Sequence, residues 1–280
     1  MRIATWNVNS IRSRLDQVVN WLEAEQPEVV CLQETKVEDA LFPRGALDRL
    51  GYRAAISGQK AYNGVAILST LPMQEVNVGF SALLPEDPIA ARLDGQKRVI
   101  SALVDGIRVL NLYVPNGASL KSEKYPFKLE WLHCLGRYLQ AQERQGDPLT
   151  MVGDFNIALE DRDIHDPARL SGTIMASEAE RKALRQALGD RLSDVFRLFE
   201  PEPGHWSWWD YRSGAWERDR GWRIDHIYLE AQLLERATGC VIHKDQRGGE
   251  KPSDHAPVVL HLDWPAAEEN GEENEPDAFW

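Results

Sequence analysis

The sequence predicts a single α/β domain, and three observations support this fold class. Short runs rich in Val, Ile and Leu recur along the whole chain and are mostly bounded by Gly, Asn, Asp or Pro, as is typical of buried strands. Segments whose apolar residues follow helical spacing lie between these runs. Strands and helices are dispersed over the full length without an internal repeat, so we expect one layered domain and no joint between two.

Eight strands are expected, in chain order, at RIATWNV (2–8), EVVCLQET (28–35), GVAILS (64–69), RVISALV (98–104), IRVLNLYV (107–114), LTMVGDF (149–155), RIDHIYL (223–229) and APVVLHL (256–262). Three longer helices are expected between them, at residues 15–26, 124–145 and 176–188. The third opens with a capping box, because Ser177 is followed three residues later by Glu180. Residues 201–221 are expected to form a loop that is unusually rich in aromatic side chains.

The ordered domain is expected to span residues 1–264, followed by an acidic, disordered tail at residues 265–280. This tail holds Glu268, Glu269, Glu272, Glu273, Glu275 and Asp277, but no Lys or Arg. It therefore carries half of the formal net charge of -12. Because so much of the charge lies in the tail, the acidic balance does not exclude nucleic acid as a substrate.

Several classes of protein are disfavoured by composition. No run of eighteen or more apolar residues is present, so a membrane span is not expected. The N-terminal residues contain no long apolar stretch, so we expect no secretory signal and a cytoplasmic location. The three cysteines, Cys31, Cys134 and Cys240, are widely spaced and odd in number. They suit buried thiols better than a disulfide framework or a zinc site.

Polar side chains interrupt or end several of the predicted strands. Any one of them could be an ordinary turn residue. An acid at Asp225, inside an apolar run, is harder to explain in this way, because a buried charge needs a partner. Strand ends are also where α/β folds gather ligand groups. The hypothesis of a functional site rests on the whole set: Asn7, Glu34, Asp154, Asn156, Asp225, Asp254 and His255. In GDFN, the period of two in a strand predicts that Asp154 and Asn156 share a side.

The residue types in this set suit a narrow chemistry. Carboxylate oxygens are the ligands that Mg²⁺ or Mn²⁺ prefer, and no thiolate or multi-histidine cluster suggests zinc. An imidazole beside such a cation can bind a phosphate oxygen or transfer protons, and a carboxylate behind it would keep it charged. The sequence has no glycine-rich phosphate loop, no Gly-x-Ser-x-Gly elbow and no cysteine nucleophile. Metal-assisted hydrolysis of a phosphodiester by water is therefore the chemistry we expect.

Six motifs carry a resemblance to a known family. WNVNSIR, LQETKV, NLYVPNG, GDFNIA, GWRIDHI and KPSDHAPV resemble, in order and spacing, the motifs of the exonuclease III family of abasic-site endonucleases. That family lies within the DNase I-like endonuclease/exonuclease/phosphatase superfamily. The resemblance covers about residues 1–264 and implies a four-layer α/β sandwich, in which two mixed β-sheets pack face to face and are flanked by helices. One departure is Ser10, which stands where the family often has glycine.

The resemblance implies roles for the matching residues. Glu34 is expected to be the main metal ligand, with Asn7, Asp154, Asn156 and Asp254 beside the metal. The expected catalytic residues are Tyr113, Asp154, Asn156, Asp225 and His255. Among these, Asp154 would orient or deprotonate the attacking water, while Asn156 and His255 would stabilise the charge that develops on the phosphate. Asp225 would orient His255. Which group acts as the general base is left open.

The aromatic loop is expected to contact the substrate. The resemblance implies a pocket for a sugar without its base, and places Tyr211 and Arg212 where the family inserts side chains into the duplex. The expected substrate-binding residues are Asn116, Trp208, Tyr211, Arg212, Trp222 and Ile224. Trp206 and Trp209 are expected to form a local aromatic core instead. Basic residues near the motifs, including Lys36 and Arg223, could provide a positive track for DNA, although each alone would more often be a solvated surface residue.

The function implied is that of a Mg²⁺-dependent DNA repair nuclease, with Mn²⁺ as a substitute cation. It would cut the phosphodiester 5′ to abasic sites in duplex DNA and also act on 3′ ends, as a 3′→5′ exonuclease and a 3′-phosphatase or phosphodiesterase. One alternative keeps the superfamily but changes the substrate to an RNA tail, a phosphoinositide or sphingomyelin. Another is a non-catalytic DNA-binding module, which would predict broken motifs. A monomer is expected, and the acidic tail could dock a protein partner.

Overall fold

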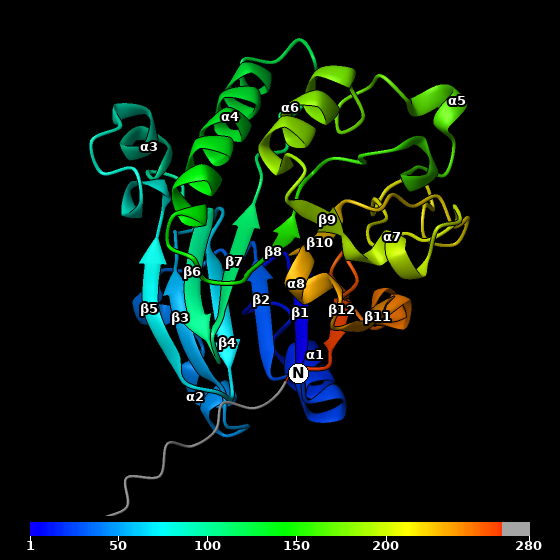
Figure 1. The fold of residues 1–280 in the computed structure, drawn as a ribbon. Coiled ribbons are helices and arrows are strands. Elements are labelled where there is room, and N and C mark those ends of the chain that lie inside the picture. Colours follow the sequence, from blue (N-terminus) through cyan, green and yellow to red (C-terminus); the bar gives the residue numbers. More distant parts are fainter. Residues whose placement is uncertain (265–280) are drawn as a thin grey trace, which may run out of the picture.

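Two mixed β-sheets packed face to face make up the centre of the molecule (Figure 1). The computed structural model describes residues 1–264, and the predicted acidic tail lies outside the described residues. The first sheet has the order β11 (Ala237–Ile242), β12 (Val258–Leu262), β1 (Arg2–Asn7), β2 (Val29–Gln33), β4 (Val65–Ser69) and β3 (Arg53–Ser57). The second has the order β5 (Met73–Val78), β6 (Val99–Val104), β7 (Ile107–Tyr113), β8 (Leu149–Asp154), β10 (Asp225–Glu230) and β9 (Leu192–Asp194).

Helices cover the outer faces of both sheets. The three longest in the described part of the chain are α1 (Leu15–Glu25), α4 (Lys124–Glu143) and α6 (Glu178–Leu188), and all three were predicted. The capping box at the start of α6 is confirmed, since Ser177 accepts from the backbone of Glu180 and the Glu180 side chain accepts in return. The shorter helices are α2 (Arg44–Asp48), α3 (Pro88–Leu93), α5 (Pro167–Leu170), α7 (Val195–Phe199) and α8 (Ala231–Leu234), with 3₁₀ turns at η1 (Asp39–Leu41), η2 (Phe80–Ala82), η3 (Asp161–Asp163) and η4 (Lys244–Gly248).

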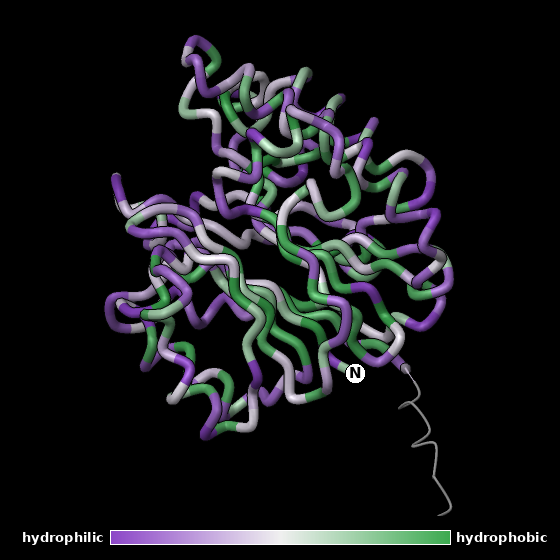
Figure 2. Tube along the Cα trace, turned by 90° about the vertical axis from the view of Figure 1, so that its left-hand side faces the viewer, coloured by the Kyte–Doolittle hydropathy of each residue, from purple (hydrophilic) through white to green (hydrophobic). Residues whose placement is uncertain are grey.

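Three apolar layers separate the four structural layers. The layer between the sheets is formed by strand residues that face inward, such as Ile3 and Cys31 from the first sheet and Val109 and Val152 from the second. On the outside, Trp131 of α4 helps to cover the second sheet. Trp6 and Trp21 pack edge to face over the first sheet, with ring centroids 5.5 Å apart. Figure 2 shows these hydrophobic strand segments in the interior and polar loops around them. The predicted four-layer sandwich is therefore confirmed.

The topology brings distant parts of the sequence to one edge. β1 runs parallel to β2, and β7 runs parallel to β8. Because Asn7 at the end of β1 is hydrogen-bonded to Asp154 at the end of β8, the C-terminal ends of these four strands lie on the same side of the two sheets. β10 runs antiparallel to β8, and Asp225 at its start is paired with Asp154 at the end of β8. β12 likewise runs antiparallel to β1, which brings the segment before β12 to this edge.

The prediction for the cysteines is confirmed. All three cysteines are buried and free. No helix within residues 1–264 is both long enough and apolar enough to cross a membrane.

Candidate active site

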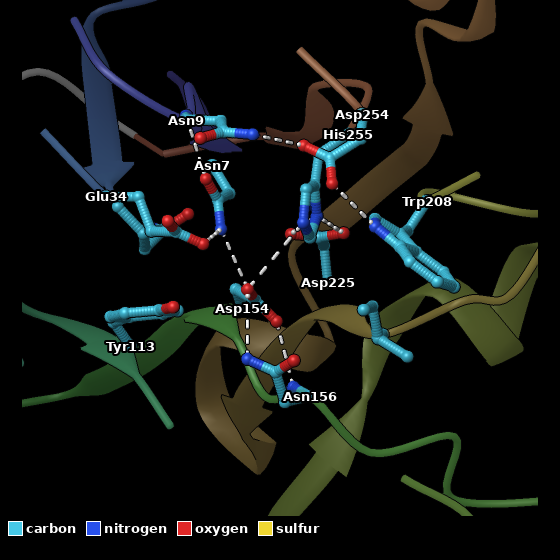
Figure 3. A network of polar contacts seen from close by, with 12 residues as sticks. Asn7, Asn9, Glu34, Tyr113, Asp154, Asn156, Trp208, Asp225, Asp254 and His255 are labelled. Carbon is cyan, nitrogen blue, oxygen red and sulfur yellow. Dashed lines mark hydrogen bonds and ion pairs between the residues drawn. The ribbon is translucent and has the colours of Figure 1, made fainter. Parts of the chain in front are cut away.

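The polar residues predicted from six separate motifs meet at this one edge (Figure 3). Asn7 ends β1, Glu34 follows β2, and Asp154 ends β8, while Asp225 begins β10. His255 lies in the irregular segment before β12. Gly153, which precedes Asp154, allows the close approach of β7 and β8: a Cβ there would lie 2.0 Å from the carbonyl oxygen of Leu112.

Asn7 joins the two carboxylates on one side of the site. Its Nδ2 donates to Glu34 Oε1 at 2.9 Å and to Asp154 Oδ2 at 2.9 Å. The remaining amide oxygen accepts from the backbone N–H of Asn9 at 2.9 Å. Lys36 adds an ion pair to Glu34, with Nζ and Oε2 2.7 Å apart. Burial alone raises the pKa of Glu34, but the Lys36 charge and the hydrogen bond from Asn7 outweigh it and lower that pKa.

A buried acid–imidazole pair forms the opposite side. His255 Nδ1 lies 2.8 Å from Asp225 Oδ2, and Ser207 Oγ donates to the same carboxylate oxygen at 2.6 Å. His255 Nε2 points toward the first group, 3.8 Å from Asp154 Oδ2. This explains how the apolar strand β10 tolerates an acid, because Asp225 is paired with His255 and hydrogen-bonded to Ser207.

The two sides affect each other's protonation. Burial disfavours the imidazolium, but the carboxylates of Asp225 and Asp154 outweigh it and raise the pKa of His255 to about 10. Burial also raises the pKa of Asp154, helped by the charges of Asp225 and Glu34 and opposed by His255 and Asn7. The site therefore combines a charged imidazole with a carboxylate that binds a proton more readily than usual.

Asp254 is held in place by two donors. Its Oδ1 accepts from Asn9 Nδ2 and its Oδ2 accepts from Trp208 Nε1, both at 3.0 Å. The side chain thus ties the loop after β1 to the aromatic loop. In the described structure Asp254 contacts the polar network through Asn9, and its predicted place beside a metal stays a prediction.

Tyr113 and two asparagines line the β7–β8 side. Tyr113 lies beneath the guanidinium of Arg98, 4.4 Å from its ring centroid, and burial together with the Glu34 charge raises the pKa of Tyr113 well above its ordinary value. Asn116 Nδ2 donates to Asn156 Oδ1 at 2.8 Å. Asn156 does lie beside Asp154, as predicted, but the reason is not the period of two in a strand. β8 ends at Asp154, and the chain then turns, so that the N–H of Asn156 donates to Asp154 Oδ1 at 2.8 Å.

Left-handed backbone conformations gather at the site. Five residues other than glycine that follow β1, β2 and β8 have positive φ: Asn9 (43°), Ser10 (86°), Glu34 (51°), Lys36 (53°) and Asn156 (49°). Ser10 shows why glycine is favoured at its position, since side chains rarely adopt this region. Such conformations persist only where the surroundings determine them, and they cluster at functional sites.

The aromatic loop divides into a core and a cavity wall. Trp206 and Trp209 are buried with Ala256 in a small apolar cluster, which confirms the predicted local core. Trp208 and Trp222 line a cavity of about 570 Å³ together with Leu170 and the guanidinium-bearing Arg169, Arg212 and Arg220. Ile224 lies beneath this wall and is only 1% exposed. Tyr211 is 48% exposed, while its hydroxyl donates to the Pro252 carbonyl at 2.7 Å.

Arg223 corrects one expectation. The sequence predicts that Arg223 either contributes to a positive track for DNA or is a solvated surface residue. Its side chain is only 1% exposed, so neither prediction holds. Its Nε donates to Asp163 Oδ1 at 2.8 Å, and its Nη2 donates to Asp194 Oδ2 at 2.6 Å. Both acids lie at the ends of neighbouring elements, so Arg223 is a structural residue that fixes the entry to β10 and cannot reach DNA.

Sequence reasoning missed several members of the site. Ser207 holds Asp225, Ser253 donates to the Asn7 carbonyl at 2.6 Å, and Arg98 covers Tyr113. Ser253 lies inside the motif KPSDHAPV, which is the sequence signal that identifies it. Nothing in the local sequence distinguishes Ser207 or Arg98, because their partners are distant in the chain.

The donor set suits a hard divalent cation. Glu34, Asp154, Asp225 and Asp254 bring four carboxylates to the site, and the described residues there include no thiolate. Ligand atoms of Asp154, Asp225 and His255 all lie within 4.8 Å of one another. However, Asp225 already serves His255 and Ser207, so Glu34 and Asp154 are the carboxylates better placed to hold an ion.

An α/β sandwich with a charged histidine facing hard carboxylates defines a class of enzyme that hydrolyses phosphate esters. The sequence profile of the Endonuclease/Exonuclease/phosphatase family matches residues 4–255. Exodeoxyribonuclease III of Haemophilus influenzae is 37% identical over 270 residues, which cover 92% of this chain and 98% of that protein. The chain belongs to the Endonuclease/Exonuclease/phosphatase family, and it is a hydrolytic phosphodiesterase.

Two solved structures are also similar over 94% of this chain and 100% of theirs. One is the 3′ phosphatase NExo from Neisseria bound to a product DNA hairpin, with a TM-score of 0.88 and 40% sequence identity. The other is an AP endonuclease from Archaeoglobus fulgidus, with a TM-score of 0.87 and 39% identity.

Proposed function

We propose that this protein is a Mg²⁺-dependent DNA repair nuclease. It hydrolyses the phosphodiester 5′ to abasic sites in duplex DNA and removes nucleotides or blocking groups from 3′ ends. The observation that carries this function is the buried pair of Asp225 and His255 facing the linked carboxylates of Glu34 and Asp154. The relatives are named for the same activities: an exodeoxyribonuclease III, an AP endonuclease and a 3′ phosphatase bound to DNA.

The surface around the site suits a polymer. The aromatic cavity lies on the Trp208 side, and a second cavity of about 640 Å³ lies on the other side, lined by Tyr113 and Asn116. Arginines line the first cavity, and Arg98 and Lys124 line the second. A duplex extends beyond its scissile phosphate in both directions, and cations on both sides offset the negative charge of the protein.

Each side chain then has a task that its contacts support. His255, kept charged by Asp225, donates from Nε2 to a phosphate oxygen and stabilises the charge that develops on it. Asp154, whose carboxylate lies between Asn7 and His255, accepts a proton from the attacking water. Asn116 orients Asn156 beside Asp154. Glu34 and Asp154 would hold Mg²⁺, which supplies Lewis-acid stabilisation of the phosphate when bound.

The aromatic loop supplies the substrate preference. Trp208 and Trp222 offer an apolar wall to a deoxyribose that has lost its base, and such a nucleotide loses little stacking when it leaves the duplex. Tyr211 and Arg212 are exposed beside this wall and would contact the duplex next to the damage.

A gel assay tests this function. The purified protein is given a duplex with one abasic analogue, a matched intact blunt duplex and a duplex with a 3′-phosphate, each with Mg²⁺ or EDTA. We expect cleavage 5′ to the analogue and 3′-end trimming, both abolished by EDTA and by Glu34→Ala. Glu23→Ala, an exposed helix position, is the matched control and should retain activity. No cleavage of any DNA, with activity on RNA or a phospholipid instead, would contradict the proposal.

A further inference from the structure

Lys128 is a charged residue buried next to the site, and the mechanism above does not use it. It lies in α4, its side chain is 0% exposed, and its ion-pair partner Glu180 in α6 is also 0% exposed. Burying two charges costs free energy that their attraction does not always recover, so a buried pair calls for an explanation beyond stability.

All three N–H groups of the ammonium have an acceptor. Lys128 Nζ donates to Glu180 Oε1 at 2.5 Å, to the backbone carbonyl of Asn156 at 2.7 Å and to the backbone carbonyl of Asn116 at 3.2 Å. An ammonium has three donors, so Lys128 is fully satisfied. Two of its three acceptors are the main chains of the two asparagines whose side chains meet beside Asp154.

Asn156 needs such support because of its backbone. With φ at 49°, it is in the left-handed region, which asparagine tolerates better than most residues but which persists only where the surroundings determine it. Its N–H is bound by Asp154 Oδ1, its Nδ2 donates to the Val114 carbonyl at 3.0 Å, and its carbonyl is bound by Lys128. Among residues 1–264, the ammonium is the one hydrogen-bond donor to this carbonyl, and removing it would leave the carbonyl without that bond.

Neighbouring groups keep the ammonium in place. Glu180 is fixed by the capping box, and it also accepts from the N–H of Met175 at 3.2 Å. Gly117 packs on the lysine stem, since a Cβ at this residue would lie 3.3 Å from Lys128 Cδ and 3.0 Å from Ile174 Cδ1. Lys128 therefore has little freedom to move away from the two carbonyls.

We propose that Lys128 is a positioning residue: it clamps the loops after β7 and β8 so that Asn116 and Asn156 keep the orientation that phosphodiester hydrolysis requires. The inference rests on the proposed function, because the rate it controls is that of DNA cleavage. Lys128 acts through the backbone of these residues and does not touch substrate.

The test separates positioning from stability. Lys128→Met removes the ammonium but leaves the Glu180 charge buried and unpaired, so it should unfold at a lower temperature. Lys128→Met combined with Glu180→Gln removes both charges and should recover most of the thermal stability. Arg108→Met is the matched control, because Arg108 is a buried cation paired with Asp147 at the far end of β7. Each variant is assayed for Tm, and for kcat and KM on the abasic duplex.

We expect kcat to fall roughly tenfold or more in Lys128→Met and to stay low in the double variant, with KM little changed. Arg108→Met should lose stability and keep its kcat. In an Asn156→Ala background, Lys128→Met should cost at most about a further twofold, because both changes affect the same group. Recovery of kcat together with Tm in the double variant would overturn the inference.

A crystal structure of the double variant gives a readout that does not depend on activity. Asn156 should leave the left-handed region or its contact with Asn116 should break. An unchanged loop would refute the clamp even if the wild type cut no DNA, whereas an inactive wild type would by itself refute the proposed function.

Discussion

Asp225 contributes to the site through His255. The carboxylate is buried, it accepts from Ser207, and its charge keeps the facing imidazole protonated through the neutral range. A donor to phosphate must carry a proton, so activity that depends on His255 should be lost only as pH rises toward the raised pKa. The pH profile of the reaction therefore reports the strength of this pair.

Asp225→Asn should move the alkaline limit of kcat downward. In the wild type we expect this limit near the His255 pKa of about 10. Without the carboxylate, that pKa should return toward the ordinary value of about 6.5, so at pH 8 only a few per cent of the imidazole is charged and kcat falls about 30-fold. Profiles of kcat from pH 6 to pH 10.5 measure this. A variant whose alkaline limit stays in place would show that His255 is not the group that titrates.

At the scale of elements, an ionic network fixes the start of β10. Asp163 at the end of η3 and Asp194 at the end of β9 both bind Arg223, two residues before Asp225. Burial alone would raise the pKa of Asp163. The charges of Arg223 and Arg197, together with the hydrogen bond from Arg223, outweigh the effect of burial and hold this pKa well below its usual range. The charge of Asp163 therefore stabilises the fold at pH values above about 4, the ordinary pKa of an aspartate in the unfolded chain. This contribution is lost progressively as the pH falls below that value.

Asp163→Asn should lower the free energy of unfolding by about 3 to 5 kcal/mol at pH 7, because it leaves Arg223 partly unpaired in the interior. The difference from wild type should shrink as pH falls from 4 to 3. Urea unfolding at pH 7, 4 and 3 checks both statements. Asp161→Asn is the control: Asp161 is 59% exposed and pairs with Arg181, so its loss should cost less than about 1 kcal/mol.

Strands that the sequence predicted and strands that it missed differ in position within the sheets. All eight predicted strands are present, and each of them is flanked on both sides by other strands of its sheet. The four missed strands, β3, β5, β9 and β11, are the outermost strands of the two sheets. Edge strands are partly exposed, and β5 has a pattern that is mostly exposed, so they lack the apolar run that identifies a buried strand.

For the whole molecule, the net charge of -12 opposes an anionic substrate, and half of it lies in residues 265–280. Truncation after Trp264 should raise kcat/KM for duplex DNA severalfold at low salt, because repulsion between the acidic segment and DNA slows association. The gain should disappear near 0.5 M salt, where charges are screened over about 4 Å. Steady-state kinetics of both forms across a salt series measures this. A truncated protein that cleaves more slowly at every salt concentration would instead give the segment a supporting role.

The sequence by itself determined the family motifs, the central strands and the acids, amides and histidine of the site. Each of these leaves a local pattern, because a buried strand is apolar and a polar residue within or after it is conspicuous. Tertiary structure alone decided that Ser207 supports Asp225, that Arg223 is buried between two acids and that Lys128 holds the backbone of Asn116 and Asn156. Such roles depend on contacts across long loops, where the same serine, arginine or lysine would be unremarkable on a surface.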